Sequence, residues 1–390
     1  MKKKVVVIGD VEMGAGTLTD DFISDKALSE LIRMLSKQEE PIDLILNGDT
    51  FDFLKCPYID KKGNKSFPDH ITEQISRQKV LQISKAHQRV FDAWKEFVKN
   101  KKNSLTFIIG NHDPDLIYPG VQEQIYTLLK RKENIFFKTI YQQHRIHVEH
   151  GHKYDLMSHM DFDKFSINHK GNTILNLPWI SLGVIRNFLS IKEEHPFLER
   201  IKPLKVMFSV YPLISKKLSK RFIQFLVKSL FYHPWRYYND PTYDFPRILR
   251  RELYSRLKNF NWEIGDLISS FKKNLKHNDH NKLYIFGHEH KKYVEEISVV
   301  ILEPDTWRDE YILDSKLRIL EAKKKYYVEI TINENDDLQW QLNCWPIKRS
   351  LLKFDEVIKD EFAFLHHAAK EEEYSFPDLS DIKLQSLLNH

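Results

Sequence analysis

The sequence Gly48-Asp49-Thr50-Phe51-Asp52 directly follows the apolar run Leu44–Leu46, and the chain repeats this arrangement at four other places. An apolar run of this length is typical of a buried strand, and a glycine at its end lets the backbone turn sharply. Polar side chains at the ends of neighbouring strands meet at one edge of a sheet, so the segments together predict a single site. The other four are Gly9-Asp10-Val11-Glu12, Gly110-Asn111-His112-Asp113, His150-Gly151-His152 and Gly287-His288-Glu289-His290.

These segments contain the residue types that hold divalent metal ions. Asp, Asn and His supply suitable oxygen and nitrogen atoms, but no single segment has enough of them to hold an ion alone. Two cations a few ångströms apart need a carboxylate that bridges them, and Asp49 is the natural bridge. The remaining ligands fall into two sets, which are Asp10 and His290 for one ion and Asn111, His150 and His288 for the other.

A bridged pair of cations suits the hydrolysis of a phosphate ester, because it activates a water, holds the phosphoryl oxygens and neutralises developing charge. His112 is placed to give a proton to the leaving oxygen, with Asp113 orienting its imidazole. We expect Asp52 and His152 to lie beside the metal ligands rather than on a metal. His152 is also an alternative to His150 as the ligand, although the first histidine of the motif is favoured.

The ordered series of these segments resembles the calcineurin-like metallophosphoesterase superfamily. The resemblance covers residues 1–155 and 281 to about 345. It implies a mixed α/β or α+β fold, in which a two-sheet β-sandwich is flanked by helices in four layers (αββα) and carries a dinuclear site at the strand ends. It also implies a proton-donor role for His112 and metal-binding roles for Asp10, Asp49, Asn111, His150, His288 and His290.

One position departs from the family pattern. The first motif normally reads Asp-x-His, whereas this chain has Glu12 in place of the histidine. One interpretation is that Glu12 binds a metal, favours harder ions over zinc, and adds negative charge that makes a bound water less acidic. The other is that Glu12 is not a ligand and one metal binds weakly. We expect two divalent ions, most simply Mn²⁺, with Fe²⁺, Mg²⁺ and Zn²⁺ as alternatives.

The pattern of apolar residues divides the chain into three parts. Residues 1–155 alternate strand-like runs with helix-like stretches, such as Lys26–Lys37 and Ile71–Val98, which is typical of an α/β sheet. Strand-like sequence returns at Leu283–Phe286 and continues through Leu338–Cys344. We therefore expect a metallophosphoesterase core at 1–155 plus 281–346, a helical insertion that caps the site at 156–280, and a helical tail at 347–390.

The expected insertion is basic and rich in aromatic residues. It has 21 Lys and Arg against 11 Asp and Glu, a net charge of +10, whereas the whole chain carries +5 and the rest therefore −5. Within Lys216–Trp235, lysines and arginines separate apolar residues at helical spacing, among them Phe222, Phe225 and Trp235. One interpretation is a helical subdomain with an aromatic core and solvated lysines. The other is a cap that binds an anionic substrate with an apolar part, contacts a membrane surface, or binds single-stranded nucleic acid.

The composition favours a cytoplasmic protein, either free or peripheral to the membrane. Two cysteines, Cys56 and Cys344, cannot form a disulfide framework, and neither belongs to a CxxC pair. No stretch offers eighteen uninterrupted apolar residues, which argues against a membrane span.

The sequence thus predicts a hydrolase in which a hydroxide held between two metals attacks a phosphoester or pyrophosphate bond. The insertion is similar in position to that of the UDP-2,3-diacylglucosamine pyrophosphatases, which favours a lipid-linked or nucleotide substrate. The GNHD motif differs from the Asn-Arg-Asp form usual in that subfamily. The alternatives are a nuclease or phosphodiesterase acting on nucleic acid, and a degenerate phosphoesterase that serves as a binding or scaffold module. The oligomeric state stays open.

Overall fold

Two β-sheets form the centre of the protein. The computed structural model describes residues 3–155, 157–158, 160, 164–245, 249–251, 254, 267–275 and 280–377. Six strands form one sheet in the order β18-β17-β1-β2-β5-β6, and five form the other in the order β13-β14-β12-β8-β7. The first comprises β1 (Lys3–Gly9), β2 (Ile42–Asn47), β5 (Ser104–Ile108), β6 (Ile135–Lys138), β17 (Lys325–Ile332) and β18 (Leu338–Trp345). The second comprises β7 (Ile140–Gln143), β8 (Ile146–Glu149), β12 (Leu283–Ile285), β13 (Lys292–Glu296) and β14 (Val300–Pro304).

The side chains of β1 show how the layers pack. Successive side chains of a strand point to opposite faces, and a strand buried on both faces is apolar throughout. Val5 and Val7 accordingly belong to the core between the two sheets, whereas Val6 and Ile8 belong to the core beneath the helices. Those helices are α1 (Asp25–Ser36), α2 (Glu73–Ala86), α3 (Gln88–Phe97) and α4 (Pro119–Leu129).

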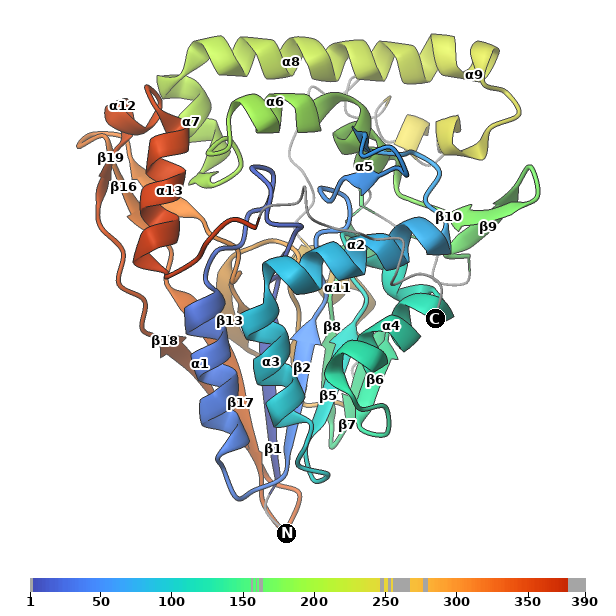
Figure 1. Ribbon diagram of the computed structural model, residues 1–390. Coiled ribbons are helices and arrows are strands. Elements are labelled where there is room, and N and C mark those ends of the chain that lie inside the picture. The colour runs from blue at the N-terminus through green and yellow to red at the C-terminus, as the bar shows by residue number, and fades with distance from the viewer. Residues whose placement is uncertain are drawn as a thin grey trace.

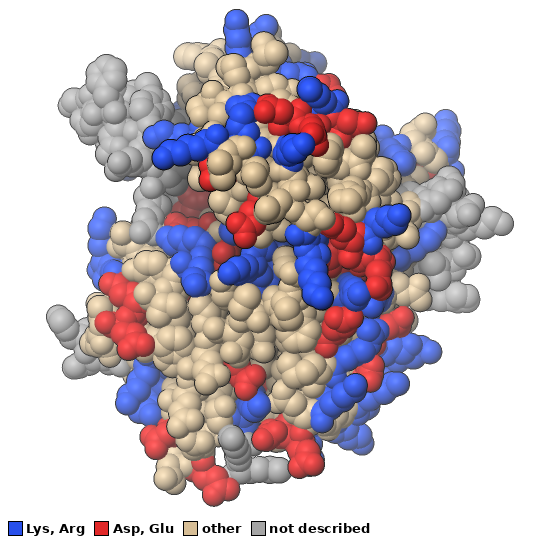
Figure 2. Space-filling view, turned by 90° about the vertical axis from the view of Figure 1, so that its left-hand side faces the viewer, with Lys and Arg blue, Asp and Glu red and all other residues tan. Residues whose placement is uncertain are grey.

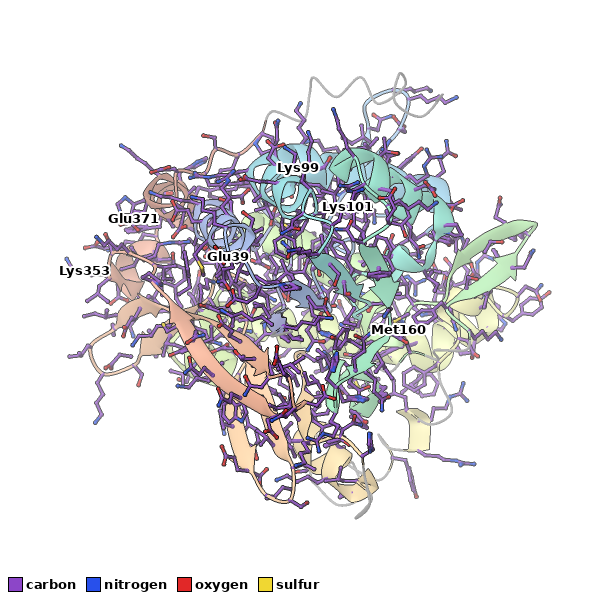
Figure 3. The ribbon with its side chains drawn as sticks, turned by 90° about the horizontal axis from the view of Figure 1, so that it is seen from below. Glu39, Lys99, Lys101, Met160, Lys353 and Glu371 are labelled. Atoms are coloured by element: carbon purple, nitrogen blue, oxygen red, sulfur yellow. The ribbon has the colours of Figure 1, made fainter. Side chains whose placement is uncertain are left out.

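A further helix covers the second sheet. Leu267 and Phe271 of α11 (Leu267–Asn274) pack against Tyr284 and Phe286, at the outer face of that sheet. Figure 3 shows the layers from below, with Glu39 and Lys99 marking the side of α1 and α3. The four-layer arrangement of helix, sheet, sheet and helix confirms the fold class that the sequence predicts.

One local prediction in the core needs correction. The helix predicted over Ile71–Val98 is two helices, α2 and α3, which are separated at His87. The His87 imidazole lies between two buried carboxylates, with Nδ1 2.8 Å from Asp25 and Nε2 3.0 Å from Asp20, so it is anchored where the helix breaks. The loop that follows Cys56 also contains a short hairpin of β3 (Tyr58–Ile59) and β4 (Lys65–Ser66).

The described part of the insertion is mostly helical, and its helices between residues 179 and 236 lie along the top of the molecule in Figure 1, whereas α11, also within 156–280, packs on the second sheet. The insertion begins with a hairpin, β9 (Ser166–His169) and β10 (Asn172–Leu175), so the purely helical prediction was incomplete. The elements that follow are α5 (Trp179–Gly183), η3 (Val184–Phe188), α6 (Leu189–Glu194), β11 (Ile201–Lys202), α7 (Leu204–Val210), α8 (Pro212–Val227), η4 (Lys228–Tyr232), α9 (His233–Arg236) and η5 (Pro241–Tyr243).

The insertion and the C-terminal segment share a sheet and a core. Strand β11 pairs with β15 (Tyr311–Asp314). The same sheet continues with β16 (Ile319–Ala322) and ends with β19 (Leu352–Lys353). The core beside this sheet combines Ile191 and Phe197 of the insertion with Leu365 of α13 (Glu361–Glu371), which follows α12 (Phe354–Val357). Residues 378–390 of the predicted helical tail lie outside the described residues.

Candidate metal centre

The strand order brings the five predicted segments to one edge of the sandwich. Strands β1, β2 and β5 run parallel, so Asp10, Asp49 and Asn111, which follow them, emerge at the same end. Strands β8 and β12 are also parallel and deliver His150 and His288 from the second sheet. A site at the carboxyl ends of strands is a general property of open α/β sheets.

The backbone of the site is strained. Asp10, Glu12, Asp49, His288 and His290 all have positive φ, between 41° and 78°, in the left-handed region that favours glycine. Each such residue costs on the order of 1–3 kcal/mol, so it persists only where the surrounding structure holds it. Because the strained residues are predicted metal ligands, the strain indicates a functional site rather than a contribution to folding stability.

Asp49, Asn111, His150 and His288 form a group that we call the first half-site. His150 Nδ1 is 3.1 Å from the carbonyl oxygen of Asn47, to which it can donate. Its Nε2 lies 3.0 Å from Asp49 Oδ2 and 3.1 Å from Asn111 Oδ1. One imidazole nitrogen and two side-chain oxygens converge here, and this donor set fits a divalent metal, which would take the place of the imidazole proton.

The charge of the first half-site supports this fit. Although burial opposes a charged imidazole, Asp49 raises the pKa of His150 to about 9. Ligand atoms of Asp49, His150 and His288 all lie within 4.8 Å of one another. His288 Nε2 is 3.1 Å from Asp155 Oδ2, which leaves its other ring nitrogen for a metal. Burial opposes ionisation of Asp155, but its hydrogen bond with His288 lowers the pKa of this carboxyl to about 2.

Asp10, Glu12 and His290 form the second half-site. His290 Nε2 lies 3.2 Å from Glu12 Oε1 and 3.6 Å from Asp10 Oδ1, while its Nδ1 is 3.0 Å from Glu310 Oε1. A histidine that donates one ring nitrogen to a carboxylate and turns the other toward oxygen donors has the arrangement of a metal ligand. Asp10 Oδ2 is buried and accepts no hydrogen bond from any described residue.

Two buried cations pair with Glu12. Arg308 Nη1 lies 3.1 Å from Glu12 Oε2 and 3.3 Å from its Oε1, and Lys55 Nζ lies 3.3 Å from Oε2. Burial opposes ionisation, but Arg308 and then Lys55 hold the pKa of Glu12 well below its ordinary value. Glu12 is therefore ionised and paired with two cations, and the expectation that it makes a metal-bound water less acidic stays a prediction.

Lys55 and Arg308 belong to a larger buried network that sequence analysis missed. Both also pair with Asp21, at 2.8 and 3.2 Å, and with Glu199 of the insertion, at 3.0 and 3.5 Å. Lys192, also from the insertion, lies 2.5 Å from Asp21. The insertion thus contributes charged groups to the surroundings of Glu12. Only the position of Lys55, three residues after Asp52, offered a local signal.

His112 lies beside the first two carboxylate segments, with a different partner from the one we predicted. Its Nδ1 is 3.2 Å from Asp52 Oδ1, and its side chain is one-fifth exposed. Asp113 instead accepts hydrogen bonds from the backbone N–H groups of Gly110, Thr50 and Phe51. The prediction that Asp113 orients the imidazole is corrected. Asp52 has that position, and Asp113 fixes the backbone of two strand-end turns.

His152 lies beside the first half-site, with its ring centroid 5.3 Å from that of His150 and 6.4 Å from that of His288. Its side chain is buried. His150, rather than His152, is the histidine within hydrogen-bonding distance of Asp49 and Asn111.

The comparison with known families agrees with this geometry. The family model of the calcineurin-like phosphoesterases matches residues 3–292, which is most of the chain. The protein therefore belongs to the calcineurin-like phosphoesterase family, a class of metal-dependent phosphoester hydrolases. A search of curated proteins found no match.

Proposed function

We propose that this protein hydrolyses a phosphoester or pyrophosphate bond with the help of two divalent cations. The first half-site would hold one cation and the second half-site the other, with Asp49 shared between them. When bound, the cations supply an activated water and neutralise charge on the phosphoryl group. The observation that carries this proposal is the convergence of metal-ligating side-chain atoms around His150 Nε2 and around His290 Nε2.

His112 is the proposed proton donor to the leaving oxygen. Asp52 lies beside its Nδ1, so Nε2 is left for the substrate. Burial disfavours the imidazolium, but Asp52, Asp49 and Glu12 raise the pKa of His112 to about 10, which keeps the donor protonated at neutral pH. A proton held on a partly exposed imidazole beside the metal ligands is what general acid catalysis requires.

The leaving group provides the test of this role. p-Nitrophenolate leaves without a proton, whereas an alkoxide needs one. In His112→Asn we expect kcat with Mn²⁺ to fall on the order of 10²–10³-fold for an alkyl phosphodiester. For the p-nitrophenyl ester the factor by which kcat falls should be about ten times smaller. His144→Asn, a partly exposed histidine at the opposite end of β8, is the matched control. Equal losses on both esters would refute the proton-donor role. A wild-type protein without turnover under Mn²⁺, Mg²⁺, Fe²⁺ and Zn²⁺ would instead be a binding module.

The substrate that we propose carries an apolar chain, and the insertion would bind it at a cytoplasmic membrane surface. Exposed apolar side chains gather on α8, η4 and α9, where Phe231 is 73% and Trp235 76% exposed. Of the aromatic residues noted in this stretch, only Phe225 is buried, so most of them do not form a core. The same elements expose Lys220, Arg221, Lys228 and Arg236. Aromatic and basic groups on one helical surface are typical of interfacial membrane binding.

An apolar cavity in the insertion supports the same substrate class. It has a volume of about 580 Å³ and lies among α5, η3, α6, α7 and α8, with Ile180, Phe188, Phe208 and Phe222 in its lining. An acyl chain suits a cavity of this composition. None of the helices described by the structure is long and apolar enough to span a membrane, so the proposed contact is peripheral.

A membrane and a nucleic acid differ in the charge they require. An extended nucleic-acid track needs a continuous basic surface. On the face shown in Figure 2, the described acidic and basic side chains are interspersed, with no broad area of one sign. That face therefore offers no such track.

Co-sedimentation separates these alternatives. We expect the protein to sediment with phosphatidylglycerol vesicles and not with phosphatidylcholine vesicles. Phe231→Ser with Trp235→Ser should abolish sedimentation, whereas Leu317→Ser, which removes a similarly exposed residue between β15 and β16, should leave it unchanged. Single-strand DNA binding that falls steeply between two salt concentrations, without vesicle binding, would favour the nuclease.

A further inference from the structure

Outside the metal centre, a second cluster of metal-ligating side chains joins the core to the insertion. His70 precedes α2 in the core, His169 ends β9 in the insertion hairpin, and Asp240 directly precedes η5. Ligand atoms of the three side chains lie within 4.8 Å of one another. Their sequence separation is 99 residues between the histidines and 71 from His169 to Asp240, so no local motif announces them.

The distances between the donor atoms suit a small transition-metal ion. Asp240 Oδ2 is 2.9 Å from His70 Nε2 and 3.9 Å from His169 Nε2. Ligands at about 2.0–2.1 Å in a tetrahedral site are about 3.3 Å apart, a value between these two. Ligand atoms of the two imidazoles lie within 4.8 Å of one another, so the three side chains surround a space that a modest adjustment would fit to one ion. Two imidazoles and one carboxylate form a donor set that zinc and its neighbours prefer.

The unpaired ring nitrogen of His169 is a second observation, beside the donor distances, that points to a bound ion. The side chain is only 8% exposed, and its Nε2 is buried without a hydrogen-bond partner among the described residues. That atom faces Asp240 at 3.9 Å, too far for a hydrogen bond. A buried polar atom without a partner is costly, and a metal ion between His169 and Asp240 would satisfy it.

The surroundings orient the carboxylate and leave an opening. Asp240 Oδ1 accepts hydrogen bonds from the backbone N–H and the hydroxyl of Thr242, at 3.0 and 2.8 Å, which leaves Oδ2 for the histidines. The side chain of His70 is 40% exposed, so an ion and a water ligand can reach the cluster from solvent.

We propose that His70, His169 and Asp240 bind a Zn²⁺-type ion that clasps the insertion to the core. Neighbouring contacts also join the insertion to the core. Arg186 of the insertion lies 2.9 Å from Asp69, the residue before His70, and Tyr243 donates to the same carboxylate at 3.1 Å. The ion would strengthen a junction that these contacts already form, and it would be separate from the catalytic metals.

The number of bound zinc ions tests the proposal. The full-length protein is stripped with a chelator, dialysed against Zn²⁺ and analysed by mass spectrometry for zinc per chain. His70→Ala and His169→Ala should each bind one ion fewer than the wild type, and His144→Ala should bind as many as the wild type. Because the result is a difference, it does not depend on how many ions the catalytic centre takes.

Unchanged zinc content in both variants would refute the clasp and leave a His70–Asp240 ion pair. Circular dichroism and Mn²⁺-dependent phosphoesterase activity verify that each variant is folded. If His169→Ala unfolds, the test rests on His70→Ala, because the His70 side chain is more exposed. Wild-type zinc content in His70→Ala would then overturn the proposal. Loss of activity with the clasp ion retained would count against the proposed reaction only.

Discussion

The two half-sites occupy the same edge of the sandwich but balance charge in different ways. In the first, Asp49 is surrounded by Asn111 and His150, and the pocket attracts positive charge strongly enough to raise the pKa of His150 to about 9. In the second, the carboxylate of Glu12 is paired with Arg308 and Lys55. Burial opposes a charged His290 in the second half-site as well, but its hydrogen bonds with Glu12 and Glu310 raise its pKa to about 9. The half-sites therefore differ in that permanent cations pair with a carboxylate of the second.

Asp49→Asn should have the largest effect, because the proposed bridge serves both half-sites. We expect phosphodiesterase activity with Mn²⁺ to fall on the order of 10³-fold or more, with fewer metal ions bound per chain. Asp337→Asn, an exposed carboxylate after β17, is the control. If only one ion were lost and activity stayed within ten-fold, the half-sites would be independent and Asp49 would not be shared.

Arg308→Met should damage the second half-site through stability. Removing one partner of a buried ion pair leaves its carboxylates uncompensated, which costs about 3–5 kcal/mol. Urea unfolding should show this loss, while Arg318→Met, at an exposed arginine paired with Asp355, should change stability by less than about 0.5 kcal/mol. The double variant Glu12→Gln/Arg308→Met should recover part of the stability. Additive losses in that double-mutant cycle would show that Arg308 does not compensate Glu12.

The contribution of His87 to stability should depend on pH, unlike that of Arg308. Burial disfavours a charged His87, but Asp25 and Asp20 raise its pKa to about 10 from an ordinary 6.5. Because the folded pKa is the higher one, this stabilisation is complete below about pH 6.5 and is lost as the pH rises toward 10.

The measurement compares the wild type with His87→Gln. The wild type should be more stable by on the order of 3 kcal/mol at pH 6, and this difference should vanish by pH 10. The contribution of Arg308, by contrast, should be constant over the same range, since its guanidinium does not lose its proton there. A difference for His87 that stays constant with pH would mean that His87 is neutral in the folded protein.

The first half-site could be predicted from the sequence more completely than the second. Asp49, Asn111 and His150 follow apolar runs. The length of such a run and the residues of the turn after it can be recognised in the sequence itself. Arg308 comes to Glu12 from nearly three hundred residues away, and the insertion supplies Glu199 and Lys192, so these contacts depend on tertiary packing. The same holds for Asp52, which lies beside His112 in place of the adjacent Asp113. An α/β sheet was predictable because strands such as β1 are apolar on both faces, whereas the four-layer arrangement was predicted from the family resemblance.

Glu12→His should have the smallest effect, and it distinguishes the two interpretations of Glu12. The substitution restores the family's usual residue, while Arg308 and Lys55 keep Asp21 and Glu199 as partners, so the fold should survive. If Glu12 is a metal ligand, exchanging its oxygen for an imidazole nitrogen favours zinc over manganese. We expect the ratio of Zn²⁺-supported to Mn²⁺-supported activity to rise about ten-fold.

Glu12→Gln is the matched control, because it keeps an oxygen donor and removes only the charge. Its metal preference should stay close to that of the wild type, with weaker binding at the second half-site. If the histidine variant also keeps the wild-type preference, Glu12 is not a ligand. Its role would then be limited to the ion pairs with Arg308 and Lys55, and the second cation would rest on Asp10, Asp49 and His290 alone.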